Sequence, residues 1–219
     1  LRGTGSTSTA EANAPPQPAK DAGAAGALLP SPYYNRPTQE GIYEHYAAVA
    51  VETGLPLVIY NIPGRTASNI SPDTIGRLAQ IENIVGVKEA CGDLDQIAHV
   101  VAACPDDFAV LSGDDCLTLP LMSVGGKGAI STTSNVAPGP VAELVRTIAA
   151  GDFARGRQLH HELLPLFDAL FCETNPIPVK AACAALGWCD GEIRLPLTPI
   201  TAPNLERLQV VMKDLGILQ

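Results

Sequence analysis

The chain has 219 residues, of which 46% are hydrophobic and 17% are charged, and its formal net charge is −9. This balance is that of a globular protein with one large domain, or one domain and an appendage, and excludes a disordered chain. The negative charge argues against a nucleic-acid partner, because binding to phosphates requires clustered Lys and Arg side chains.

Apolar runs and helical patterns alternate over the first 150 residues. Strands are predicted at 27–30, 55–60, 84–88, 108–112 and 128–131, and helices at 41–53, 71–79, 94–103, 116–124 and 140–150. Such alternation predicts an α/β fold with a parallel sheet covered by helices. A further helix expected within 10–22 is interrupted by the run Pro15-Pro16-Gln17-Pro18, which a helix interior does not tolerate.

The pattern changes after residue 150, where the strands stop and three helices are predicted at 153–171, 176–186 and 203–215. We therefore expect a catalytic (β/α) domain over 1–150 and a C-terminal helical domain over 151–219. Polar residues at successive strand ends favour a TIM (β/α)8 barrel over an open doubly wound sheet, and no glycine-rich phosphate loop is present. Only five clear strands and a possible remnant at the start are visible, so we expect the barrel to lack its first strands.

One lysine, Lys88, differs from the other four because it alone falls in a predicted strand. In a barrel interior its ammonium group would lose hydration, which lowers its pKa and increases the fraction of neutral amine. The neutral amine is the form that attacks a carbonyl to give a Schiff base. The alternative is a strand lysine that pairs with a carboxylate such as that of Glu89.

Two further residues suit chemistry on a keto acid. Tyr60 ends the strand before that of Lys88, where its phenol can exchange a proton near the amine. Arg65 follows on the next loop and can hold a carboxylate by two hydrogen bonds. Taken singly, Tyr60 is an ordinary core tyrosine and Arg65 a solvated loop arginine, but with Lys88 they form a coherent site.

Five motifs, taken in order along the chain, resemble the successive signatures of the dihydrodipicolinate synthase family. They are SPYYNRP at 31–37, YNIPGRT at 60–66, GVKEA at 86–90, SGDD at 112–115 and NPIPVK at 175–180. The resemblance runs from about Gly3 to the C-terminus. It implies a TIM barrel with a C-terminal helical domain and a class I, Schiff-base aldolase chemistry.

The resemblance also implies catalytic roles for three side chains. Lys88 would form the imine with pyruvate, and Tyr60 would relay protons during imine formation and later ring closure. Tyr34 would reach across a tight dimer interface and complete the proton relay of the neighbouring subunit.

Substrate binding is implied for three other positions. Arg65 would hold the carboxylate of aspartate semialdehyde, and the backbones of Gly113 and Ile130 would line the pyruvate pocket. The resemblance implies that the enzyme condenses pyruvate with L-aspartate 4-semialdehyde, the first committed step of lysine (diaminopimelate) biosynthesis. The imine itself would act as the electron sink, so the resemblance implies neither a metal nor a cofactor, and it implies a homotetramer built as a dimer of dimers.

A cytoplasmic location is expected from three observations. No apolar run is long enough to span a bilayer, no signal peptide is recognisable, and the six cysteines form no C-x-x-C pair. We interpret the cysteines as reduced thiols, which suit that compartment.

Two other functions remain open from the sequence. One is another pyruvate-dependent aldolase such as N-acetylneuraminate lyase, although enzymes of that kind usually lack an arginine at the place of Arg65. The other is an inactive fragment that serves only as an assembly module, because the family's Thr-Thr-Gly-Glu segment would lie upstream of Leu1. Feedback inhibition by lysine and the activity of the chain by itself are likewise open.

Overall fold

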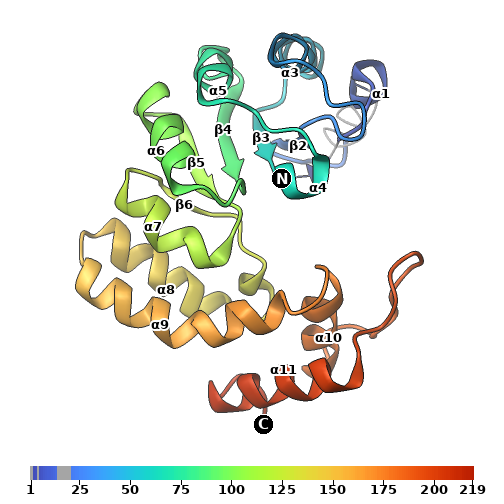
Figure 1. Ribbon diagram of the computed structural model, residues 1–219, viewed down its shortest axis with the longest axis vertical. Helices are drawn as coiled ribbons and strands as arrows, with labels where there is room; N and C mark the ends of the chain where they lie inside the picture. Colours follow the sequence, from blue (N-terminus) through green and yellow to red (C-terminus); the bar gives the residue numbers. More distant parts are fainter. Residues whose placement is uncertain (1, 4, 14–20) are drawn as a thin grey trace. The chain divides into compact units, whose positions relative to one another are not determined.

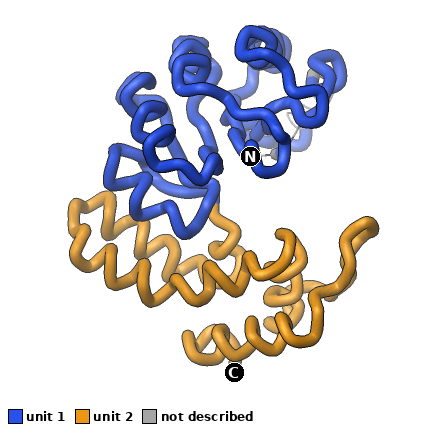
Figure 2. The backbone as a smooth tube through the Cα atoms, in the orientation of Figure 1, with its two compact units in different colours: residues 1–130 blue, residues 131–219 orange. Residues whose placement is uncertain are grey.

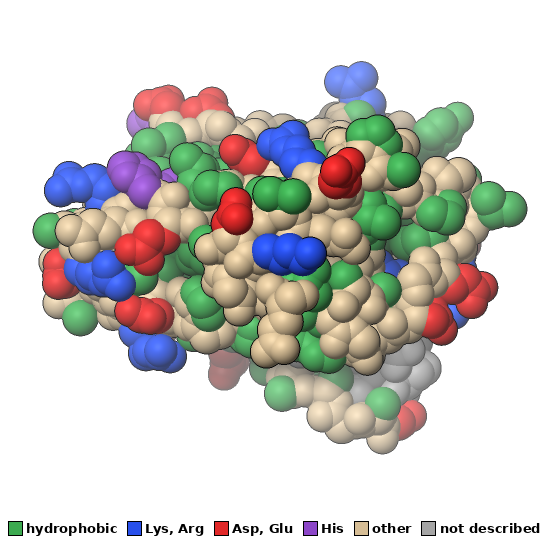
Figure 3. All heavy atoms as spheres, turned by 90° about the horizontal axis from the view of Figure 1, so that it is seen from below, with side chains coloured by type: hydrophobic (Ala, Val, Ile, Leu, Met, Phe, Trp, Pro, Cys, Tyr) green, Lys and Arg blue, Asp and Glu red, His purple; other side chains and the backbone are tan. Residues whose placement is uncertain are grey.

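The computed structural model of the chain describes residues 2–3, 5–13 and 21–219. Contacts between Cα atoms group them into two compact units, residues 1–130 and 131–219 (Figure 2). The proline run at 15–18, where the sequence predicts an interrupted helix, lies outside the described residues. Side chains of both charges are scattered among hydrophobic ones on the face drawn in Figure 3.

The first unit is built around a parallel sheet whose six strands follow one another in chain order. The strands are β1 (Arg2–Gly3), β2 (Ala27–Pro30), β3 (Leu57–Asn61), β4 (Ile84–Glu89), β5 (Ala109–Ser112) and β6 (Gly128–Ala129). Parallel strands in consecutive order, joined by helices, have the connectivity of a (β/α) barrel. The predicted α/β class and the five predicted strands are confirmed, and β1 is the expected remnant at the start.

The longer helices lie along one side of this sheet, and the short helix α4 lies at the end of β3 (Figure 1). They are α1 (Thr9–Asn13), α3 (Gln39–Thr53), α4 (Pro63–Thr66), α5 (Pro72–Leu78), α6 (Leu94–Ala103), the 3-10 helix η1 (Asp115–Leu117) and α7 (Thr118–Ser123). Each longer helix packs beside the next, α1 on α3, α3 on α5, α5 on α6 and α6 on α7. Ser71 caps α5, because its hydroxyl accepts a hydrogen bond from the Thr74 amide.

Two local predictions were wrong in detail. No helix is predicted directly after the strand at 55–60, yet the chain forms the short helix α4 there, because Pro63 can occupy a first helical turn. The helix expected at 116–124 begins as η1, where the Asp114 carboxylate accepts a hydrogen bond from the Cys116 amide, and then continues as α7.

Alternating side chains give the sheet two different faces. Ile59 and Val87 are fully buried, with the apolar sides of α3, α5 and α6 supplying much of the surrounding core. Successive residues of a strand point to opposite faces. Asn61 and Glu89 therefore lie on the same face as Ile59 and Val87, whereas Tyr60 and Lys88 point to the other face.

The second unit is helical. It contains the 3-10 helix η2 (Thr133–Asn135) and the helices α8 (Pro138–Ala149), α9 (Phe153–Leu170), α10 (Ile177–Ala185) and α11 (Ala202–Asp214). Leu166, Leu170, Leu208 and Met212 are fully buried in its core. The three predicted C-terminal helices are confirmed. Because α8 packs along α9, the compact unit begins at Ser131, earlier than the boundary at 150 that the sequence predicts for the catalytic domain.

Candidate active site

Lys88 and Tyr60 face each other across two neighbouring strands. They are paired in the parallel register of β3 and β4, and the Lys88 Nζ lies 4.3 Å from the centroid of the Tyr60 ring. Both side chains are half-buried. The amine that the sequence singles out is thus next to the phenol expected to serve it, at the carboxyl ends of the strands, where barrels carry their active sites.

The charge state of Lys88 is set mainly by its burial. Loss of hydration lowers the pKa of its amine below the usual value for lysine. The carboxylate of Asp115, which is only 2% exposed, acts in the opposite direction, and the guanidinium of Arg65 lowers the pKa further. A larger fraction of the amine is therefore neutral near pH 7 than for a lysine in water.

The pKa of Tyr60 is shifted upward, so the phenol keeps its proton. Burial raises the pKa of the phenol, and the positive charge of Arg65 partly opposes this. A protonated phenol beside a neutral amine can donate a proton to a leaving hydroxyl group and take one back later. The pair therefore has the acid and the nucleophile that Schiff-base formation requires.

Gly113 adjoins the lysine side chain directly. A Cβ atom at this position would stand 2.9 Å from Lys88 Cε and 2.9 Å from Ala90 Cβ, closer than side chains pack. The Gly113 amide donates to the Glu89 carbonyl at 2.7 Å, and the Ile130 amide donates to the Ser112 carbonyl at 2.8 Å. Both predicted pocket residues therefore continue the hydrogen-bond ladder beyond the strands, on the same edge of the sheet as Lys88.

Arg65 and Tyr34 lie on loops at this edge. Arg65 is exposed on α4, directly after β3, yet its charge acts on both Lys88 and Tyr60. Tyr34 is 90% exposed and has a φ of 68°, a left-handed conformation that is uncommon for tyrosine. Among the described contacts, none joins Tyr34 to Lys88 or Tyr60, so the chain brings Tyr60, Arg65 and Gly113 around Lys88 and leaves Tyr34 projecting into solvent.

Glu89 does not act as the partner of Lys88, the alternative that the sequence leaves open. Its carboxylate lies on the helix-facing side of the sheet, where it accepts hydrogen bonds from Asn61 Nδ2 at 3.0 and 3.1 Å and from the Cys91 amide at 2.9 Å. Burial raises the pKa of this carboxyl group, and these donors oppose the shift. Sequence reasoning missed this buried pair, although two polar residues at the ends of apolar strands were a usable signal.

Elsewhere, the described residues contain no cluster of three His, Cys, Asp or Glu side chains that could hold a metal ion. No helix in the described part of the chain is long and apolar enough to cross a membrane.

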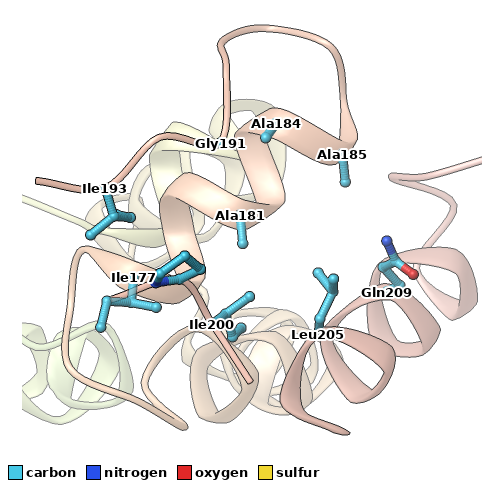
Figure 4. Close-up of a pocket in the computed structure, with 10 residues that line it drawn as sticks. Ile177, Ala181, Ala184, Ala185, Gly191, Ile193, Ile200, Leu205 and Gln209 are labelled. Atoms are coloured by element: carbon cyan, nitrogen blue, oxygen red, sulfur yellow. The ribbon is translucent and has the colours of Figure 1, made fainter. Parts of the chain in front are cut away.

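The second unit has a cavity of about 290 Å³ between α10, α11 and the loop that joins them (Figure 4). Its lining is apolar apart from Gln209, and it contains none of the residues predicted to carry chemistry.

The fold agrees with comparisons to known proteins. Residues 1–215 match the model of the dihydrodipicolinate synthetase family. The chain belongs to this family. The 4-hydroxy-tetrahydrodipicolinate synthase of Syntrophus aciditrophicus is 52% identical over 218 residues, which cover 100% of this chain and 75% of that protein. Its name belongs to the family that the sequence resembles.

Solved structures of the dihydrodipicolinate synthetase family superpose closely on the chain. The enzyme of Aquifex aeolicus is 50% identical with a TM-score of 0.96, over 98% of this chain and 74% of that one. The Acinetobacter baumannii enzyme, solved with pyruvate, is 47% identical with a TM-score of 0.95, over 99% and 74%. Another member, 44% identical with a TM-score of 0.97 over 99% and 73%, is described as a monomeric variant. These matches confirm the predicted fold class.

Proposed function

We propose that this chain condenses pyruvate with L-aspartate 4-semialdehyde through an imine on Lys88, as a 4-hydroxy-tetrahydrodipicolinate synthase in lysine biosynthesis. The observation that carries the proposal is the half-buried Lys88 amine, with a lowered pKa, 4.3 Å from the Tyr60 ring centroid. The match to the family and the relative solved with pyruvate support the same reaction.

The first half of the reaction follows from the two paired side chains. The neutral Lys88 amine adds to the keto carbon of pyruvate, and the resulting carbinolamine loses water as Tyr60 donates a proton to the hydroxyl group. The protonated imine then withdraws electrons from the neighbouring methyl carbon, which gives up a proton to the Tyr60 phenolate, so that the imine becomes an enamine. Gly113 leaves room for this change because it has no side chain against Lys88.

The second half requires the aldehyde substrate. The enamine carbon attacks the aldehyde of aspartate semialdehyde, and the carboxylate of that substrate is held by Arg65 at the mouth of the site. The substrate amine then attacks the imine carbon and displaces the Lys88 amine as the ring closes. Because the imine is the electron sink, this sequence of steps uses only side chains of the protein.

Assembly and location form the remaining part of the proposal. Exposed Tyr34 would complete the Tyr60 proton relay of a neighbouring subunit, in a homotetramer built as a dimer of dimers. The backbones of Gly113 and Ile130 would line the pyruvate pocket, and the protein would act in the cytoplasm. Sedimentation of the protein alone and with pyruvate tests the assembly, for which the monomeric relative is the natural reference.

Substrate selection tests the reaction itself. Purified protein is given pyruvate with either aspartate semialdehyde or N-acetylmannosamine, the aldehyde partner in the synthetic direction of N-acetylneuraminate lyase, and product is followed by mass spectrometry. Product only with aspartate semialdehyde is the expected result. Product only with the amino sugar would assign the chain to the other aldolase, and no product with either would leave an assembly module as its role.

A further inference from the structure

A second pair of residues lies one position beyond the reacting pair. Asn61 follows Tyr60 and Glu89 follows Lys88, and the two are themselves partners in the register of β3 and β4. Both are almost fully buried, with Asn61 0% and Glu89 1% exposed. Asn61 Nδ2 lies 3.0 and 3.1 Å from the two carboxylate oxygens of Glu89. The strand ends are therefore joined on the helix-facing side, directly behind the amine and the phenol.

The same asparagine closes the loop that carries Arg65. The Ile70 amide donates to Asn61 Oδ1 at 3.1 Å, and Asn61 Nδ2 donates to Asn69 Oδ1 at 2.9 Å. Helix α4, with Arg65, begins two residues after Asn61 and ends before Asn69 (Figure 1). Asn61 thus fixes both ends of the segment that holds the guanidinium.

Glu89 in turn fixes the turn after β4. Its Oε1 accepts a hydrogen bond from the Cys91 amide at 2.9 Å, which holds the chain where it leaves the strand. On the other side, Asn69 Nδ2 donates to Gln96 Oε1 of α6 at 2.7 Å. The pair is therefore anchored to the loop after β3, to the turn after β4 and, through Asn69, to a helix of the outer layer.

From this geometry we propose that Asn61 and Glu89 are positioning residues, which act through one buried hydrogen-bonded contact to hold Tyr60, Lys88 and Arg65 in reacting geometry. This inference rests on the proposed function, because it assigns these residues to the Lys88 imine reaction. Both side chains lie on the helix-facing side of the sheet, opposite the side to which Tyr60 and Lys88 point. A shift of about 1 Å in a reacting group can lower a rate by 10²-fold, so a contact that fixes two strand ends has kinetic consequences.

The donor and acceptor pattern of the pair supplies a specific test. In Glu89→Gln the amide oxygen keeps the place of Oε1, where it accepts from the Cys91 amide, so the amide nitrogen takes the place of Oε2 and puts a donor against the donor Nδ2 of Asn61. In Asn61→Asp two carboxylates face each other. The double variant Asn61→Asp with Glu89→Gln restores a matched pair with the hydrogen bond reversed, since the glutamine amide donates to the aspartate, and the exposed amide of Asn69 can rotate to follow.

The measurement is the rate at which borohydride traps the pyruvate imine on Lys88, at saturating pyruvate, in the full chain. We expect Glu89→Gln to lower this rate constant by about tenfold or more, to leave the pyruvate concentration for half-saturation less affected, and to keep the parent near-ultraviolet circular dichroism. The double variant should recover most of the lost rate. The control is Glu82→Gln, an exposed glutamate just before β4, which should behave like the parent.

A folded Glu89→Gln variant that traps pyruvate at the parent rate would overturn the inference, and so would a folded double variant that remains slow. If Glu89→Gln does not fold, the folded double variant is the test. A trapping rate near that of the parent supports the inference, and a slow rate overturns it. Loss of folding in both variants would mean that the pair serves folding only, which also overturns it. Failure of the proposed function is distinguishable, because the parent protein itself would then give no Lys88 adduct.

Discussion

Lys88 and Tyr60 are partners in one rung of the β3–β4 ladder, and the lysine amine stands 4.3 Å from the centroid of the tyrosine ring. Because the pairing is a backbone property of a parallel sheet, the two side chains are held together by the fold itself. Chemistry at this pair consequently depends on the charges around it and on the space left to the lysine. Both can be altered one residue at a time.

The charge of Asp115 should control the pH dependence of imine formation. Its carboxylate raises the pKa of Lys88, so Asp115→Asn should lower that pKa and increase the neutral amine at a given pH. The pH at which trapping with borohydride reaches half its maximal rate should move to lower values. Asp107→Asn, which removes an exposed aspartate, is the control and should leave the profile in place. A shift to higher pH in Asp115→Asn would contradict the assigned electrostatics.

Burial of Lys88 should also cost stability. A lysine with a lowered pKa in the folded state binds fewer protons there than in the unfolded state, so stability rises with pH between the folded and unfolded pKa values. At pH 7, which lies below the unfolded-state pKa of lysine, the cost of burying the amine is present. Lys88→Met should therefore raise the melting temperature at pH 7 while abolishing imine formation, and the gain should shrink as the pH rises. Calorimetry at pH 7 and pH 10 measures both effects; an unchanged or lowered melting temperature at pH 7 would count against a buried amine.

Space at the lysine depends on Gly113. Gly113→Ala places a Cβ atom 2.9 Å from Lys88 Cε and from Ala90 Cβ, and overpacking of this kind costs about 1–3 kcal/mol. We expect slower trapping of pyruvate together with a lower free energy of unfolding. Gly139→Ala is the matched control, because a Cβ atom there meets nothing within 4 Å. Equal behaviour of the two variants would show that Lys88 has room to move aside.

Loss of Arg65 should impair the use of aspartate semialdehyde much more than the use of pyruvate. Loss of a charge-assisted hydrogen bond costs about 1.5–3 kcal/mol, so Arg65→Leu should lower kcat/KM for aspartate semialdehyde by roughly 10–100-fold. Imine formation with pyruvate should persist, with its pH profile moved upward because Arg65 lowers the pKa of Lys88. Arg157→Leu, at an exposed arginine of the second unit, serves as the control. Equal losses with both substrates would argue against a selective role for Arg65.

The sequence predicted the elements well where a single pattern determined them. Helix α6 has the predicted bounds of 94–103, because its capping Asp93 and its apolar spacing agree. The strands were displaced by no more than about two residues. Helix α4 was missed because a Pro-Gly pair after a strand is typical of a turn, and four residues are too few to show helical periodicity.

The candidate site was predictable to a lesser extent. Lys88, Tyr60, Arg65 and Gly113 come together because strand order brings their loops to one edge, and strand order follows from the alternating pattern. The polar ends of two apolar strands marked Asn61 and Glu89 as candidates, but their pairing depends on the exact register of β3 on β4, which includes an irregularity between Leu57 and Val58. The role of Tyr34 depends on a second subunit, so it remains a prediction.

The central claim is that Lys88 forms an imine with pyruvate. The most direct test treats the protein with pyruvate and borohydride, digests it and locates the mass increase by peptide sequencing among the five lysines of the chain. We predict an adduct on the peptide that contains Lys88, and none in Lys88→Met. An adduct on Lys20, Lys127, Lys180 or Lys213 instead, or the absence of any adduct from the folded parent protein, would contradict the account.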